Sequence, residues 1–340
     1  MNLGGFWLLA QLSKIVTSLR HSPVYSLYVS FERRLEVGAY MITGFHHLTA
    51  IIKDAEKNKT FYTDTLGLRL VKQTVNQENL TDPHFFYGDY KGTPGTILTF
   101  FELPRVGQRH EEDSFIHEVL LKIPQGSLPF WKKRLTSKAV RLIANDEVSC
   151  SFLDPDDMKI TLVEAAEVIA PEQATRHSDV PAQYQIIGIL GIHYTVADLG
   201  TTEAFFRDVL GMSLLDHVAR PISALDGESR LIQSTRLRRS RLGKGAIDHI
   251  AYSVPERKDL DLILDKAKYR QITVEKIIDR GYFQSLYLRE PNGLRIEIAT
   301  DYPGFTLDEP LEKLGETFAL PDFLEPKRKA IEANILKRKK

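Results

Sequence analysis

Apolar and polar positions repeat in two stretches of the chain that resemble each other. Residues 45–50 and 191–196 are rich in apolar and β-branched residues, and each run is followed by a helix-like segment that ends in a glycine, Gly67 or Gly211. Each stretch predicts a strand and then a short amphipathic helix. The glycine ends the helix because it adopts a positive φ without strain.

Two further stretches also match each other. Each begins with an apolar strand, at residues 115–124 and 246–255, and ends in two apolar segments around a tight turn. The turns are Asp-Pro-Asp-Asp at 154–157 and Glu-Pro-Asn-Gly at 290–293. Proline presets φ at the first turn position, and Asn-Gly accepts the left-handed conformation. The chain therefore carries four copies of a strand–helix–strands module.

The four βαβββ modules fall into two tandem pairs and predict an α+β fold of curved, mixed sheets. The concave side of such a sheet is a natural site for a small molecule. Since Met41 begins the first patterned segment, we expect the residues before it to be poorly ordered or an artefact of translation. The expected organisation is an extension at 1–40, an N-terminal domain at 41–168, a linker at 169–185, a C-terminal domain at 186–320 and a charged tail at 321–340.

The composition argues against several classes of partner and of fold stabilisation. Hydrophobic residues make up 43% of the 340 residues, and 45 basic residues balance 45 acidic ones. This balance favours neither nucleic acid nor an anionic membrane as a partner. Cys150 is the one cysteine, which excludes a disulfide framework within the chain and fits a reducing, cytoplasmic location. It lies in an alternating apolar run, where we expect a buried small hydrophobe.

A glutamate in an apolar strand is the first sign of chemistry. Ile296 and Ile298 flank Glu297, so strand alternation places its carboxylate on the opposite face. If that face is the concave one, the buried carboxylate needs a cation or hydrogen-bond donors. Two imidazoles and one carboxylate form the facial triad typical of non-heme iron(II) oxygenases. The histidines in strand-like segments near the module starts are His46, His47, His193 and His249.

The second module does not repeat the pattern. At the positions that correspond to His249 and Glu297, it has Glu118 and Thr161. We therefore expect one functional site and one degenerate site, a common outcome of duplication.

Taken together, these segments resemble the vicinal-oxygen-chelate superfamily, and within it the ring-cleaving dioxygenases that act on hydroquinones. The resemblance extends from Ile42 to about Phe323. It implies a cytoplasmic, Fe(2+)-dependent enzyme, with Mn(2+) as the alternative metal, that cleaves an aromatic diol with dioxygen. The matching pieces are residues 44–49, 92–96, 248–251, 280–287 and 297–305.

The resemblance also implies which residues form the site. It assigns metal ligation to His47, His249 and Glu297. Around substrate and dioxygen it places His46, Arg280 and Tyr287. Catechol-type enzymes of the superfamily take all three ligands from the second half of the chain, so His193 remains an alternative to His47. Hydroquinone-type relatives carry a histidine where this chain has Asp248, a departure that bears on substrate orientation and removes no ligand.

Two other functions are compatible with the same fold. A glyoxalase-like isomerase or lyase would use zinc or nickel and a second ligating glutamate, and a metal-free, drug-binding protein would lack the triad. The implied partners are a small aromatic diol and dioxygen, with no nucleic acid and no membrane. A homo-oligomer is also compatible, because exposed sheet edges in this fold often pair subunits.

Overall fold

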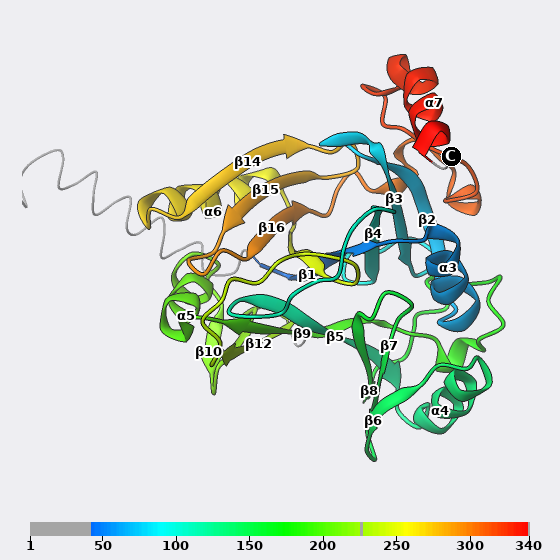
Figure 1. Cartoon of the computed structure of the whole chain (residues 1–340), viewed down its shortest axis with the longest axis horizontal. Coiled ribbons are helices and arrows are strands. Elements are labelled where there is room, and N and C mark those ends of the chain that lie inside the picture. Colours follow the sequence, from blue (N-terminus) through cyan, green and yellow to red (C-terminus); the bar gives the residue numbers. More distant parts are fainter. Residues whose placement is uncertain (1–41, 225–226, 339–340) are drawn as a thin grey trace, which may run out of the picture. The chain divides into compact units, whose positions relative to one another are not determined.

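The computed structural model describes residues 42–224 and 227–338, which form two eight-stranded sheets (Figure 1). The predicted extension at 1–40 and the proposed start at Met41 lie outside the described residues. In order across the first sheet, the strands are β14 (Thr273–Asp279), β15 (Gln284–Arg289), β16 (Arg295–Thr300), β13 (Ile247–Val254), β1 (Gly44–Ile52), β4 (Ile97–Glu102), β3 (Asn79–Gly88) and β2 (Arg69–Asn76).

The second sheet repeats this arrangement. Its strands, in order, are β10 (Ser213–Leu215), β11 (Val218–Arg220), β12 (Glu228–Gln233), β9 (Gly188–Val196), β5 (Phe115–Pro124), β8 (Lys159–Ala165), β7 (Ser149–Leu153) and β6 (Leu142–Asn145). Both sheets mix parallel and antiparallel pairs. In the first, β1 pairs antiparallel with β13 and parallel with β4, and in the second, β5 pairs antiparallel with β9 and parallel with β8. The predicted α+β fold of curved, mixed sheets is confirmed.

A helix follows the first strand of each module, as the strand–helix–strands pattern predicts, and one more helix lies after the last strand. The helices are α3 (Ala55–Thr60), which continues into the π-helix η1 (Phe61–Thr65), α4 (Leu128–Ser137), α5 (Leu199–Asp208), α6 (Arg257–Tyr269) and α7 (Arg328–Arg338). Short 3₁₀ turns are η2 (Ala182–Tyr184), η3 (Phe305–Leu307), η4 (Leu311–Lys313) and η5 (Glu325–Lys327). No helix in the described ranges is long and apolar enough to cross a bilayer.

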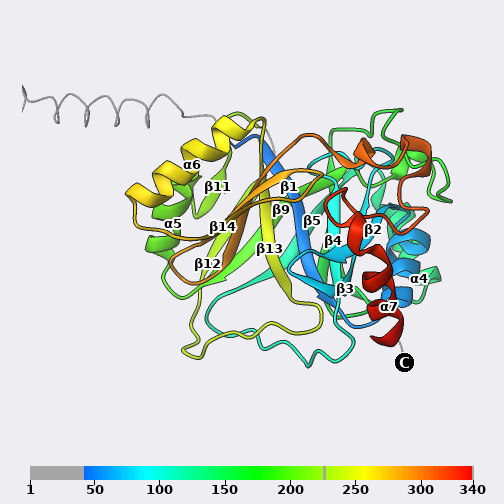
Figure 2. The ribbon, with the colours of Figure 1, turned by 90° about the horizontal axis from the view of Figure 1, so that it is seen from above.

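Each sheet combines one module from each half of the chain. In the first sheet β1 pairs with β13, which joins the first module to the fourth. In the second sheet β5 pairs with β9, which joins the second module to the third. Figure 2 shows β1 and β13 side by side although they are distant in sequence. The two sequence halves therefore share both sheets.

The hydrophobic core lies on the faces of the sheets that point away from the histidines. Leu48 and Ile250 of the first sheet and Ile192 of the second are fully buried members of one core cluster. The hydroxyl oxygens of Tyr194 and Tyr252 lie 2.8 Å apart and link β9 to β13. Strand alternation then turns the intervening polar residues toward the two concave faces.

Predicted local features are also found. The turns at 154–157 and 290–293 connect antiparallel strands, β7 to β8 and β15 to β16. Asp157 (φ 71°) and Gly293 (φ 89°) take the left-handed conformation there. Cys150 is buried in the core, as expected of a small hydrophobe.

The C-terminal residues pack against β2 and β3 of the first sheet. The side chain of Lys72, on β2, is fully buried and pairs with Asp308 (2.6 Å) and with Glu309. Gly315 has a φ of 75°, and a Cβ at this position would lie 1.9 Å from the carbonyl oxygen of Leu70. Glycine thus permits the segment to approach the strand. Within the expected charged tail, α7 lies beside β3 (Figure 1).

Candidate metal centre

Strand register brings three predicted residues together on the first sheet. Ala251 of β13 pairs with His47 of β1 on one side and with Glu297 of β16 on the other. His249 lies two residues before Ala251, on the same face of β13. The small side chain of Ala251 leaves room for the three larger ones to converge above it.

The three side chains meet at one carboxylate oxygen. Glu297 Oε2 lies 2.9 Å from His249 Nε2 and 3.3 Å from His47 Nε2. The side chain is fully buried, and Oε2 accepts no hydrogen bond from any described residue. A buried carboxylate oxygen that faces two imidazole nitrogens without an aligned hydrogen bond fits a bound divalent cation.

Neighbouring groups fix the orientation of all three. His47 Nδ1 lies 2.9 Å from His46 Nδ1, and His249 Nδ1 donates to Asp248 Oδ2 (2.6 Å). Both rings therefore turn Nε2 toward the carboxylate. Ser285 Oγ donates to Glu297 Oε1 (2.5 Å), which leaves Oε2 facing the imidazoles. Partners of this kind orient ligands in metal sites.

The pKa values describe the same charge arrangement. Burial lowers the pKa of His46 to about 3 and also lowers that of His47. Burial alone would lower the pKa of His249, but Asp248 and Glu297 raise it. Burial alone would raise the pKa of Glu297, but the two imidazoles hold it well below its usual range. The two imidazoles therefore keep the carboxylate ionised, the form in which it can bind a metal ion.

His193 lies apart from this group. It belongs to β9 in the second sheet, where its Nδ1 lies 2.7 Å from Glu118 Oε2. The structure thus joins His47, and not His193, to His249 and Glu297.

Arg280 and Tyr287, two further residues selected from the sequence, line the same cavity as His47 and His249. Arg280 Nη2 donates to the Tyr287 hydroxyl and to Glu78 Oε1, both at 2.9 Å. Glu78 stands at the turn between β2 and β3, and it also pairs with Lys276 (2.5 Å) and Arg295 (3.5 Å). The carboxylate therefore ties this hairpin turn to β14 and β16. Sequence reasoning missed Glu78, since it lies in the first module and its partners Lys276, Arg280 and Arg295 lie in the fourth.

His47, His249, Arg280 and Tyr287 line a common cavity with residues that sequence reasoning did not select. His84 on β3 lines this cavity together with His47, and its Nε2 lies 2.8 Å from Thr99 Oγ1. Burial holds the pKa of His84 well below its usual range, so the ring is neutral. The other polar residues that were missed are Thr74, Asn76 and Gln77.

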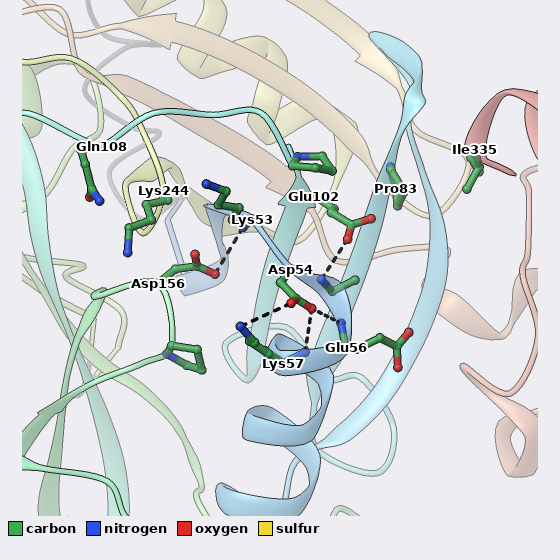
Figure 3. Close-up of a pocket in the computed structure, with 13 residues that line it drawn as sticks. Lys53, Asp54, Glu56, Lys57, Pro83, Glu102, Gln108, Asp156, Lys244 and Ile335 are labelled. Carbon is green, nitrogen blue, oxygen red and sulfur yellow. Dashed lines mark hydrogen bonds and ion pairs between the residues drawn. The ribbon is translucent and has the colours of Figure 1, made fainter. Parts of the chain in front are cut away.

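A larger cavity lies elsewhere, at the start of α3 (Figure 3). Its volume is about 750 Å³, and it contains no histidine. Two of its carboxylates already accept backbone hydrogen bonds, Asp54 from Lys57 and Glu102 from Ala55. Although it is larger, this cavity lacks the converging ligands of the metal centre.

Comparison with known proteins identifies the family. The model of the glyoxalase/bleomycin resistance protein/dioxygenase superfamily matches residues 44–122 and 188–298. The chain belongs to this superfamily, as the sequence motifs predict.

Its similar proteins include named dioxygenases. "Putative ring-cleaving dioxygenase MhqA" of Bacillus subtilis (strain 168) is 33% identical over 86% of this chain and 98% of that protein. "Chlorohydroquinone/hydroquinone 1,2-dioxygenase" of Sphingobium indicum is 26% identical over 84% of this chain and 93% of that protein. A crystal structure described as a "putative dioxygenase" from Bacillus subtilis has a TM-score of 0.77 and 31% identity, and covers 87% of this chain and 97% of that one. Glyoxalase I from Zea mays (TM-score 0.59, 14% identity; 78% of this chain, 97% of that one) shares the fold.

Proposed function

We propose that the protein is an Fe(2+)-dependent, ring-cleaving dioxygenase of the extradiol type that acts on a hydroquinone-type aromatic diol. The observation that carries this proposal is Glu297 Oε2, which is buried between the Nε2 atoms of His47 and His249 without an aligned hydrogen bond. Two histidines and one carboxylate suit iron(II) and leave positions open for substrate and dioxygen. The names of the similar proteins support the same reaction class.

The surrounding residues have defined tasks in this proposal. Iron(II), when bound, would lower the pKa of a phenolic hydroxyl and hold substrate and dioxygen together. The Arg280 guanidinium, whose side chain is 11% exposed, stabilises negative charge that develops on oxygen. Tyr287 accepts a hydrogen bond from Arg280 and is thereby held at the cavity wall. His46 and Asp248 orient the ligating imidazoles.

Two polar atoms without partners favour a diol with separated hydroxyls. Thr74 Oγ1 and Gln77 Oε1 are buried, have no hydrogen-bond partner among the described residues, and belong to residues that line the cavity. Both come from the β2 side, whereas the metal ligands come from β1, β13 and β16. A hydroxyl opposite the metal-bound oxygen could donate to one of them, whereas a catechol would direct both oxygens to the metal.

Thr74→Val is therefore expected to weaken anaerobic binding of hydroquinone and leave phenol binding unchanged. The loss of one hydrogen bond to a neutral hydroxyl corresponds to roughly 2- to 10-fold in affinity. Titration of the iron-loaded protein with each ligand measures the difference. Thr136→Val, on an exposed turn of α4, is the matched control and should bind both ligands like the wild type. Equal weakening for both ligands would contradict a role for Thr74 in recognising the second hydroxyl.

Oxygen uptake tests the proposed function directly. The metal-free protein is loaded anaerobically with iron(II), or with manganese(II) in parallel, and given hydroquinone or catechol. Uptake with hydroquinone is the expected result. Uptake with catechol alone would overturn the substrate class. Bound metal without uptake would favour a glyoxalase-like isomerase, and a protein that binds no metal would favour a small-molecule binding protein.

A further inference from the structure

The concave face of the second sheet carries its own group of ligand atoms. Register places Glu118 opposite Lys159 and Leu120 opposite Thr161, as His249 is opposite Arg295 in the first sheet. Glu118 and Thr161 thus occupy the positions that correspond to His249 and Glu297, as the sequence predicts. The triad is absent at this location, but the carboxylate lies beside two imidazoles.

Three potential ligand atoms converge there. Glu118 Oε2 lies 2.7 Å from His193 Nδ1 and 3.8 Å from His117 Nε2. One ligand atom from each of the three residues lies within 4.8 Å of the others. Two ligands of a tetrahedral zinc ion are separated by about 3.3 Å, given metal–ligand bonds of about 2.0 Å. Small side-chain movements would therefore place all three around one ion.

Neighbouring hydroxyls orient these ligands as they do in the first sheet. Thr161 Oγ1 donates to Glu118 Oε1 (2.5 Å), so Oε2 faces the imidazoles, much as Ser285 holds the carboxylate of Glu297. Thr195 Oγ1 lies 3.3 Å from His117 Nδ1, which turns Nε2 of that ring toward Glu118. Two independent contacts thus preset the geometry of the group.

We propose that His117, Glu118 and His193 form a second site for a divalent transition metal of the zinc type. Imidazole and carboxylate ligands suit zinc, and three protein ligands leave a fourth position for water. The two imidazole side chains are each 22% exposed, which lets an ion enter from solvent. The inference does not rest on the proposed dioxygenase function, because the residues lie on the other sheet.

Lys159 sets the strength of this site. Its ammonium lies 3.0 Å from Glu118 Oε1 and already compensates the carboxylate charge. A metal ion at Oε2 is repelled by this neighbouring cation, so the second site binds more weakly than the first. Lys159→Gln keeps a hydrogen-bond donor and removes the charge, and zinc affinity at the second site should rise about tenfold.

Zinc stoichiometry of the full-length, metal-free protein tests the proposal. Equilibrium dialysis with elemental analysis should find two zinc ions per chain in the wild type at saturation. One ion should remain in His193→Ala and in Glu297→Gln, and none in the double variant. His117→Ala provides a second route if His193→Ala does not fold, and circular dichroism of the metal-free proteins monitors folding.

His217→Ala is the matched control. His217 Nδ1 also lies 2.7 Å from a glutamate, Glu203, but this pair has no third ligand in the described part of the chain. The control should still bind two ions. A wild type that binds a single ion, or the same stoichiometry in His193→Ala as in the wild type, would overturn the second site. In that case the Glu118–His193 contact is a structural hydrogen bond.

Discussion

Glu297→Gln should remove iron binding from the first sheet and reduce turnover to background. The substitution keeps the size of the side chain but removes the negative charge that faces His47 and His249. Loss of orienting neighbours alone typically costs 10- to 100-fold in metal affinity, so loss of a charged ligand should cost more than about 100-fold. Iron content after anaerobic loading and gel filtration gives the measurement.

Two further variants serve as comparisons for Glu297→Gln, one with an intermediate expected effect on iron binding and one with none. Ser285→Ala removes the hydrogen bond to Glu297 Oε1 and should weaken iron binding by roughly 10- to 100-fold, an intermediate effect. Glu309→Gln alters another buried carboxylate, the partner of Lys72, and should leave the iron content unchanged. Full iron occupancy in Glu297→Gln would contradict the assignment of Glu297 as a metal ligand.

Lys72→Met should lower the free energy of unfolding by about 3–5 kcal/mol, the usual cost of removing one partner from a buried ion pair. Lys72 is fully buried, and its ammonium is shared by Asp308 and Glu309. Methionine fills the space but leaves two carboxylates without their cation. Lys72 also donates to the Phe305 carbonyl (3.3 Å), so the substitution loosens the C-terminal segment from β2.

Thermal and urea-induced unfolding measure this effect. Lys57→Met is the matched control, because Lys57 pairs with Asp54 at 3.7 Å with its side chain 74% exposed. Exposed pairs of this kind contribute about 0–1 kcal/mol. Equal destabilisation by the two substitutions would contradict the assigned role of the buried pair.

The sequence predicted the modules and the turns because these depend on local patterns, whereas the proposed ligand set came from the resemblance to a known superfamily. The alternation of residues around Glu297 predicts the face of the strand on which its side chain lies. The Asn-Gly pair predicts the turn that precedes this strand. The choice between His47 and His193 remained open, because alternation does not specify which strands pair. Only the pairing of β1 with β13 brings His47 to the centre.

Polar neighbours were harder to predict for a related reason. Ser285 and Glu78 acquire their roles from contacts that depend on strand register and on hairpin position. The burial of Lys72 likewise depends on a segment that lies far along the chain. Sequence spacing does not encode such contacts, although residues on the face of a known ligand, such as Tyr287 beside Glu297, can be found by register.

The sharing of each sheet between the two halves has a consequence during synthesis of the chain. When the first half leaves the ribosome, β1 and β5 have no partners from the second half, so their hydrogen-bonding edges are unpaired. At this stage His47 also lacks the other two residues of the triad, His249 and Glu297, because they have not yet been synthesised. Neither sheet can be completed before β9, β13 and β16 are made, and such long-range pairing is slow and exposed to aggregation. Capture of a metal ion by the triad would thus mark a chain whose two halves have already folded together.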